Sequence, residues 1–101
     1  MIVPDVNVLI YAFHSSSPEH AAARSWLQDA LTRHETVAIL DVVATGFLRI
    51  MTNPRLFSEP LEPAHAMSAL EAVLGAPNAV LLRAGESTWG IFAELVELHK
   101  L

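Results

Sequence analysis

The sequence predicts a three-layer α/β/α fold of Rossmann-like type, with a parallel sheet of about three strands. Three apolar runs have the length of buried strands, and each leads into a segment whose apolar residues repeat at helical spacing. Strands that alternate with helices of this length form a parallel sheet covered on both faces. With 101 residues, the chain has room for one domain, residues 1–101.

The first half of the chain is predicted to hold two strands and two helices. A strand at residues 2–4 runs into Asp5 and then into an amphipathic helix. Ser17, Pro18 and Glu19 are typical of a second helix start, and this helix runs to about Arg33. Its buried face is predicted to hold Ala22, Ala23, Trp26, Leu27, Ala30 and Leu31. Residues 36–40 are predicted to form a buried strand.

The second half repeats the alternation. A helix over residues 42–51 must end near Asn53, because a proline disfavours helical geometry in the residue before it. A proline-rich connection leads to a helix over residues 64–74, for which Gly75 is predicted to form a left-handed cap. A strand over residues 79–82 and a helix over residues 86–100 complete the pattern.

Composition limits the classes of function. The net charge is −5, so the chain lacks the basic surface of a protein that binds nucleic acid by neutralising phosphates alone. An RNA-cutting function would therefore need metal ions or a basic partner. No cysteine is present, which excludes disulfides and thiolate metal sites. No apolar run reaches the roughly 18 residues of a membrane span, and no secretion signal opens the sequence.

Two acidic residues come directly after predicted strands. Asp5 follows the strand at residues 2–4, and Asp41 follows the strand at residues 36–40. Ligands of open parallel sheets bind beyond the carboxyl ends of the strands, so both side chains are candidates for a functional site. Aspartate is also a favoured helix N-cap, and capping of the following helices explains both residues as well.

Two longer motifs carry a family resemblance. The opening PDVNVL at residues 4–9, followed by YA at residues 11–12, resembles the first motif of PIN-domain ribonuclease toxins of the VapC family. The stretch GFLRIMTNPR at residues 46–55 resembles a helix end of the same toxins, and the spacer with SPEH at residues 17–20 and AARSWL at residues 22–27 is also similar. The resemblance covers nearly the whole chain.

The resemblance implies a magnesium-dependent endoribonuclease in which Asp5 is a metal ligand. Asn7 would support the site by orienting the metal ion or a bound water. In such nucleases clustered carboxylates hold one or two Mg²⁺ ions, for which Mn²⁺ is a possible substitute, and the ions activate water for attack on the phosphate. Arg49, Thr52 and Arg55 are candidate RNA contacts, although a helix-terminal arginine also satisfies backbone carbonyls.

The sequence departs from the family pattern in its acids. The family's second acid, a glutamate on the third helix, would fall near Gly46, and Asp41 is the nearest residue that could replace it. The later acids of the family belong to a segment beyond Leu101, so the chain is expected to lack the C-terminal part of the domain. Glu94 and Glu97 are predicted to be solvent-facing residues of the last helix.

The resemblance also implies a cognate VapB-type antitoxin, a homodimer and a cytoplasmic location without a membrane. Because only Asp5 and Asp41 stand at the predicted edge, a second function stays open. In that interpretation the chain is a catalytically inactive remnant that serves only as a dimerisation or antitoxin-binding module. A small nucleotide-binding domain of Rossmann type fits less well, because its glycine-rich loop is missing.

Overall fold

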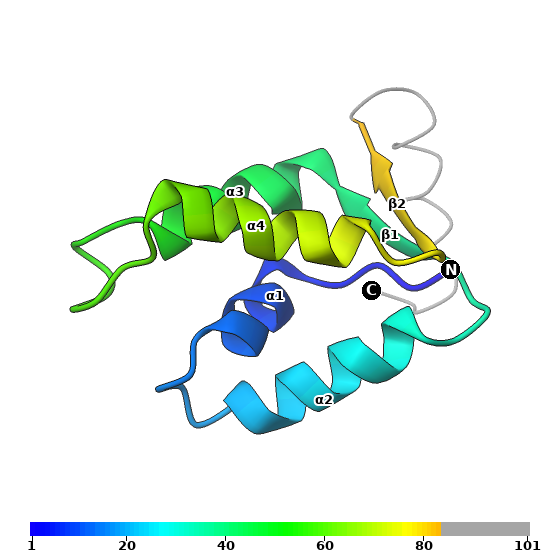
Figure 1. The fold of residues 1–101 in the computed structure, drawn as a ribbon, viewed down its shortest axis with the longest axis horizontal. Coiled ribbons are helices and arrows are strands. Elements are labelled where there is room, and N and C mark those ends of the chain that lie inside the picture. The colour runs from blue at the N-terminus through cyan, green and yellow to red at the C-terminus, as the bar shows by residue number, and fades with distance from the viewer. Residues whose placement is uncertain (84–101) are drawn as a thin grey trace, which may run out of the picture.

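The computed structural model describes residues 1–83, and the predicted helix at residues 86–100, with Glu94 and Glu97, lies outside the described residues. In chain order the elements are α1 (Val6–Phe13), α2 (His20–Leu31), β1 (Val37–Leu40), α3 (Asp41–Met51), α4 (Pro63–Leu74) and β2 (Ala79–Leu82). Figure 1 shows α3 and α4 above α1 and α2, with the strands at one end. The alternation confirms the predicted α/β fold.

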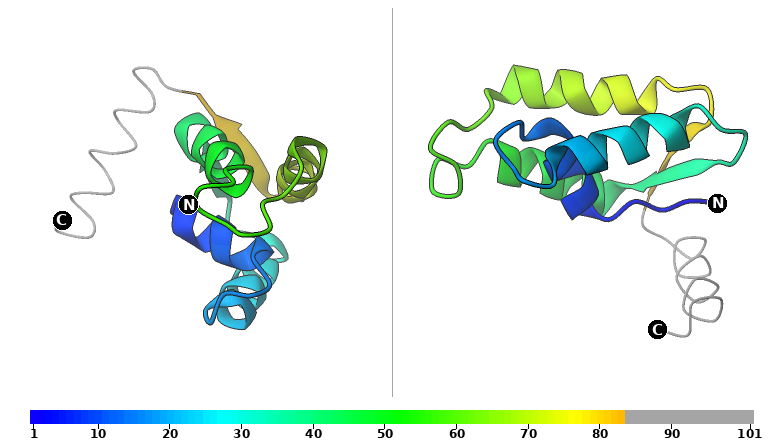
Figure 2. Two further views of the ribbon diagram at one scale, coloured as in Figure 1. Left: turned by 90° about the vertical axis from the view of Figure 1, so that its left-hand side faces the viewer. Right: turned by 90° about the horizontal axis from the view of Figure 1, so that it is seen from below.

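The sheet is parallel, as predicted. β1 and β2 pair in the register Val37 with Ala79 through Leu40 with Leu82. The predicted strand at residues 2–4 is wrong in extent: among the described residues it is reduced to a single parallel bridge between Ile2 and Val37. The Ile2 N–H donates to the Thr36 carbonyl at 2.8 Å, and the Ala38 N–H donates to the Ile2 carbonyl at 2.8 Å. Figure 2 shows this N-terminal segment running beside β1.

The core lies around β1, all four residues of which are buried. A strand that is apolar at every position is typical of a parallel sheet with helices packed on it. Phe47 of α3 is 1% exposed, and its ring meets that of Phe13 edge-on at a centroid distance of 5.7 Å. Of the predicted buried face of α2, Leu27 and Ala30 are buried, but Ala22 is exposed and Trp26 is 41% exposed. The inward position predicted for Trp26 is therefore wrong.

Three helix ends differ from the predictions. α2 begins at His20, so Ser17 and Glu19 form a turn before it; the Ser17 hydroxyl donates to Glu19 Oε2 at 2.6 Å. α3 begins at Asp41, one residue earlier than predicted, and its N-cap is Leu40. Gly75 ends α4 with φ −77° and ψ −10°, which is right-handed, so the predicted left-handed cap is wrong. Its N–H instead continues the helical pattern by donating to the Glu71 carbonyl at 2.8 Å.

Among the helices of residues 1–83, none combines the length and the apolar character needed to cross a bilayer.

Candidate functional site

The carboxyl ends of the parallel segments meet at one edge of the sheet, called here the carboxyl edge. It comprises Asp5, Asp41 and Arg83, each of which follows an extended segment. Ile2 pairs with Val37 in parallel, so Asp5 leaves the sheet at the same edge as Asp41. α1 and α3 are also in contact, with Val6 at the start of α1 beside Gly46 in the middle of α3. The structure thus places the two acids that the sequence singled out at the same edge of the sheet.

Asp5 is the N-cap residue of α1. Its backbone is extended, with φ −72° and ψ 157°, and its Oδ1 accepts a hydrogen bond from the Val6 N–H at 2.7 Å. The structural role predicted for an aspartate at this position is therefore present. Its side chain is exposed, so the carboxylate also remains accessible to an ion from solvent. Asn7 is the second residue of α1, and its side chain is also exposed.

Asp41 is the first residue of α3 rather than its cap. Its negative charge lies at the positive end of the helix dipole, where an acidic residue is favourable. Oδ1 of Asp41 is buried, and the Thr45 hydroxyl donates to its backbone carbonyl at 2.9 Å. The position of Asp41 on the carboxyl edge agrees with its candidacy as a second ligand.

The donors of this edge suit a hard cation. Carboxylate and amide oxygens are the ligands that Mg²⁺ takes in proteins, where one or two carboxylates are completed by water and substrate phosphate. Asp5 and Asp41 meet that minimum. Within residues 1–83, no group of three or more His, Cys, Asp or Glu side chains could hold a metal ion. The described part of the chain therefore offers a pair of carboxylates and not a full cage.

Gly46 lies near the place where the family resemblance implies a glutamate. It lies in the middle of α3, and a Cβ atom at this position would stand 3.6 Å from Cγ2 of Val6, the first residue of α1. That distance is an ordinary van der Waals contact. Position 46 therefore faces the start of α1, beside Asp5, and contributes no carboxylate there.

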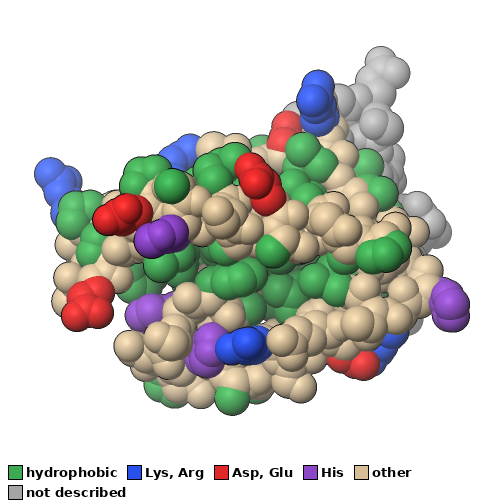
Figure 3. Space-filling model, in the orientation of Figure 1, with side chains coloured by type: hydrophobic (Ala, Val, Ile, Leu, Met, Phe, Trp, Pro, Cys, Tyr) green, Lys and Arg blue, Asp and Glu red, His purple; other side chains and the backbone are tan. Residues whose placement is uncertain are grey.

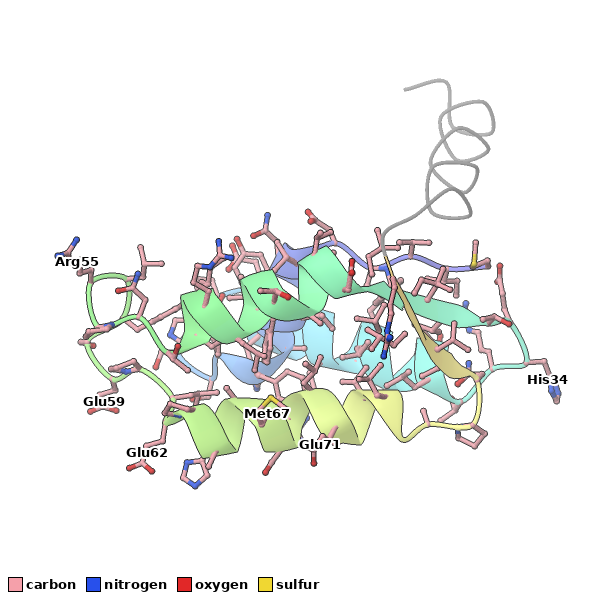
Figure 4. All side chains as sticks on the ribbon, turned by 90° about the horizontal axis from the view of Figure 1, so that it is seen from above. His34, Arg55, Glu59, Glu62, Met67 and Glu71 are labelled. Atoms are coloured by element: carbon pink, nitrogen blue, oxygen red, sulfur yellow. The ribbon has the colours of Figure 1, made fainter. Side chains whose placement is uncertain are left out.

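The three candidate RNA contacts gather at the other end of α3. Arg49 lies in its last turn, about 12 Å along the helix axis from Asp41 at 1.5 Å per residue. The Thr52 hydroxyl donates to the Leu48 carbonyl at 2.7 Å. Arg55 is exposed at the tip of the loop between α3 and α4 (Figure 4), where its N–H donates to Asn53 Oδ1 at 2.9 Å. The structure does not bring these residues to the carboxyl edge.

Arg83 is a residue that the sequence analysis missed. It follows β2 directly, as Asp41 follows β1, and its neighbour Leu82 pairs with Leu40. The rule that selected Asp41, a polar residue at the end of a parallel strand, would have selected Arg83 as well. Its side chain is exposed.

A groove of about 430 Å³ lies apart from this edge, between α1, α2 and α4. Its lining includes the apolar Leu27, Leu31 and Val73 together with Arg24. Figure 3 shows apolar side chains in the hollow between α4 and α2. His20 also lines this groove, and its Nδ1 lies 2.8 Å from the Tyr11 carbonyl, which links the start of α2 to α1.

The fold and the edge define an α/β domain with two aspartates at the carboxyl ends of parallel segments. Comparison with known families places it further: the PIN domain family matches residues 2–100. The chain therefore belongs to the PIN domain family, which confirms the resemblance seen in the two sequence motifs.

The chain is also similar to individual proteins that are named as VapC ribonucleases. The chain is 42% identical over 95 residues to a VapC ribonuclease of Mycobacterium bovis and to ribonuclease VapC43 of Mycobacterium tuberculosis, over 94% of this chain and 65% of each relative. It is 39% identical over 85 residues to ribonuclease VapC33 of Mycobacterium tuberculosis, over 84% of this chain and 59% of that relative. The chain thus spans less than two thirds of the length of these relatives.

Proposed function

We propose that this PIN domain acts as a VapC-type toxin, a magnesium-dependent endoribonuclease of the cytoplasm that hydrolyses phosphodiester bonds of RNA. The observation that carries the proposal is the 42% identity to VapC ribonucleases over 94% of the chain. The position of Asp5 supports it, because this exposed residue stands at the carboxyl edge and opens α1, which contacts α3.

Asp5, Asp41 and Asn7 each have a chemical role in this proposal. Asp5 and Asp41 would hold the ion through carboxylate oxygens. When bound, Mg²⁺ supplies a Lewis acid that lowers the pKa of water and offsets charge on the phosphate. Asn7 would orient a water molecule through its amide, which can both donate and accept a hydrogen bond. The α3 helix dipole would favour negative charge at the same edge.

A cleavage assay tests the activity directly. The chain is incubated with end-labelled single-stranded RNA in Mg²⁺, in Mn²⁺, in EDTA, and in EDTA followed by an excess of Mg²⁺. The proposal predicts cleavage with either ion, its loss in EDTA and its return with added Mg²⁺. Cleavage that persists in EDTA would contradict a metal-dependent mechanism.

The second candidate function is binding without catalysis. It is favoured by the absence, within residues 1–83, of a group of three metal-binding side chains. The groove between α1, α2 and α4 would then be the working surface, and it suits an apolar segment with an acidic residue facing Arg24. In the VapC reading, that segment would belong to a VapB-type antitoxin, and the chain would pair with a second copy as a homodimer.

Substitutions in the groove test the binding function. Leu31→Arg places a charge in the groove, whereas Ala21→Arg places the same charge on an exposed position of α2. Only the first should abolish binding of a VapB-type antitoxin in a titration followed by calorimetry. Binding without RNA cleavage in the unsubstituted chain would establish the module and exclude the enzyme, and sedimentation would report whether the chain is dimeric.

A further inference from the structure

A ribonuclease site at the carboxyl edge must hold an anion beside two carboxylates. The whole chain carries a net charge of −5, and Asp5 and Asp41 add repulsion where an RNA phosphate would lie. A metal ion offsets part of this charge, but substrate must also bind in the correct position. A fixed cation on the protein would meet that need, and the present inference about it rests on the proposed function.

The positions of the other cations leave this role unfilled. Arg24 lines the groove between the helices, and Arg33 forms an ion pair with Asp29 near the end of α2. Arg49 and Arg55 lie toward the far end of α3. Lys100 lies outside the described residues. None of these four arginines is placed by its element at the carboxyl edge.

The strand register places Arg83 there. Leu40 pairs with Leu82 on adjacent parallel strands, which run about 4.8 Å apart, and Asp41 and Arg83 are the residues that directly follow these two strand ends. Ile2 pairs with Val37 on the other side of β1, so the segment that ends in Asp5 flanks the same edge. Arg83 is exposed to solvent.

We propose that Arg83 binds a phosphate group of the RNA substrate at the carboxyl edge, next to the Asp5 and Asp41 carboxylates. A guanidinium group stays charged at every relevant pH and donates two parallel hydrogen bonds to phosphate oxygens. Arg83 directly follows β2, and the pairing of β2 with β1 sets where this residue leaves the sheet.

The ends of two helices add to the same anion site. α1 begins at Val6 and α3 begins at Asp41, so the positive ends of both helix dipoles lie at the carboxyl edge. Backbone N–H groups at helix starts favour phosphate oxygens. Arg83 and the two helix starts would thus bind a phosphate directly. The two aspartates would bind it only through a bridging metal ion.

RNA binding in EDTA tests this role without metal or catalysis. Arg83→Gln is compared with Arg33→Gln, which removes the same charge near the amino ends of the strands, just before β1. We expect Arg83→Gln to weaken binding of a single-stranded RNA several-fold more than Arg33→Gln. The slope of log affinity against log salt should fall by about 0.7, the value of one lost phosphate contact on a single strand. Arg83→Lys should keep most of the salt slope and lose part of the affinity.

The outcomes separate this inference from the proposed function. Equal RNA affinities of the Gln variants at positions 83 and 33, with both folded by circular dichroism, would overturn the role of Arg83. If Arg83→Gln does not fold, Arg83→Lys decides the question: an RNA affinity equal to that of the unsubstituted chain would overturn the role of the guanidinium group. Weakened RNA binding by Arg83→Gln in a chain that cleaves no RNA would support the phosphate site and refute the proposed activity.

Discussion

Gly46 of α3 faces Val6 of α1 across a distance that one more carbon atom would fill: a Cβ at position 46 would lie 3.6 Å from Val6 Cγ2. We predict that Gly46→Glu adds a third carboxylate beside Asp5 and tightens Mn²⁺ binding several-fold, because each carboxylate adds charge and an oxygen ligand to a hard-cation site. Electron paramagnetic resonance of free Mn²⁺ measures the affinity.

Gly46→Ala is the matched control for this substitution. It supplies the Cβ without the carboxylate, and it should stabilise α3 by about 0.5–1 kcal/mol, because glycine is unfavourable inside a helix. Mn²⁺ affinity that rises equally in the alanine and glutamate variants would show that helix stability, and not a new ligand, is responsible.

Asn78 connects the end of α2 to the start of β2. Its Nδ2 donates to the Ala30 carbonyl at 2.9 Å and to the Glu35 carbonyl at 2.8 Å. Asn78→Ala should lower the free energy of unfolding by about 1–3 kcal/mol, because both acceptors lose a partly buried donor. Urea denaturation measures the change. Ser68→Ala, which removes an exposed hydroxyl from α4, should change it by no more than about 0.5 kcal/mol; equal effects would refute the bridging role.

Ser17 sets the acidity of Glu19. Its hydroxyl donates to Glu19 Oε2 at 2.6 Å, and this bond, together with a backbone hydrogen bond, lowers the pKa of Glu19 below its ordinary value of 4.5. A lowered pKa in the folded state means that the linked stability is present above the unfolded pKa and is lost as pH falls through the folded one. Ser17→Ala should raise the pKa of Glu19 toward 4.5 in an NMR titration.

Thr32→Ala is the comparison for this titration. Its hydroxyl donates to the Asp29 carbonyl at 2.9 Å, so its removal deletes a surface hydroxyl without touching Glu19. A pKa of Glu19 that stays low in Ser17→Ala would contradict the assigned cause.

The sequence predicted elements best where composition and spacing agreed. β1 is apolar at every position and flanked by polar residues, and it is buried as predicted. α3 ends at Met51, before Pro54, as the restriction on residues before proline requires. Tertiary packing decided the rest: Trp26 has the helical spacing of a core residue, yet α2 turns it outward, and the first predicted strand pairs at Ile2 alone among residues 1–83.

The sequence could likewise predict some features of the candidate site and not others. The approach of Asp5 to Asp41 follows from the rule that parallel strands end at one edge, so it was predictable. The separation of Arg55 from that edge depends on where the loop after α3 leads, which no local pattern specifies. Arg83 was predictable by the same rule as Asp41, because it also follows a parallel strand. It was missed because only acidic residues were considered at the strand ends.

Asp5→Asn tests whether the Asp5 carboxylate binds the metal ion. Asparagine caps a helix as well as aspartate, so the bond from the Val6 N–H is kept while the negative charge is lost. Asp29→Asn removes an equivalent charge from the surface of α2. In a Mg²⁺-dependent RNA cleavage assay, we predict that Asp5→Asn lowers the cleavage rate by more than about 100-fold. A residue that only hydrogen-bonds to a metal ligand typically costs less than this when it is replaced. The melting temperature of Asp5→Asn should be unchanged. Cleavage by Asp5→Asn at the rate of Asp29→Asn would contradict the assignment of Asp5 as a metal ligand.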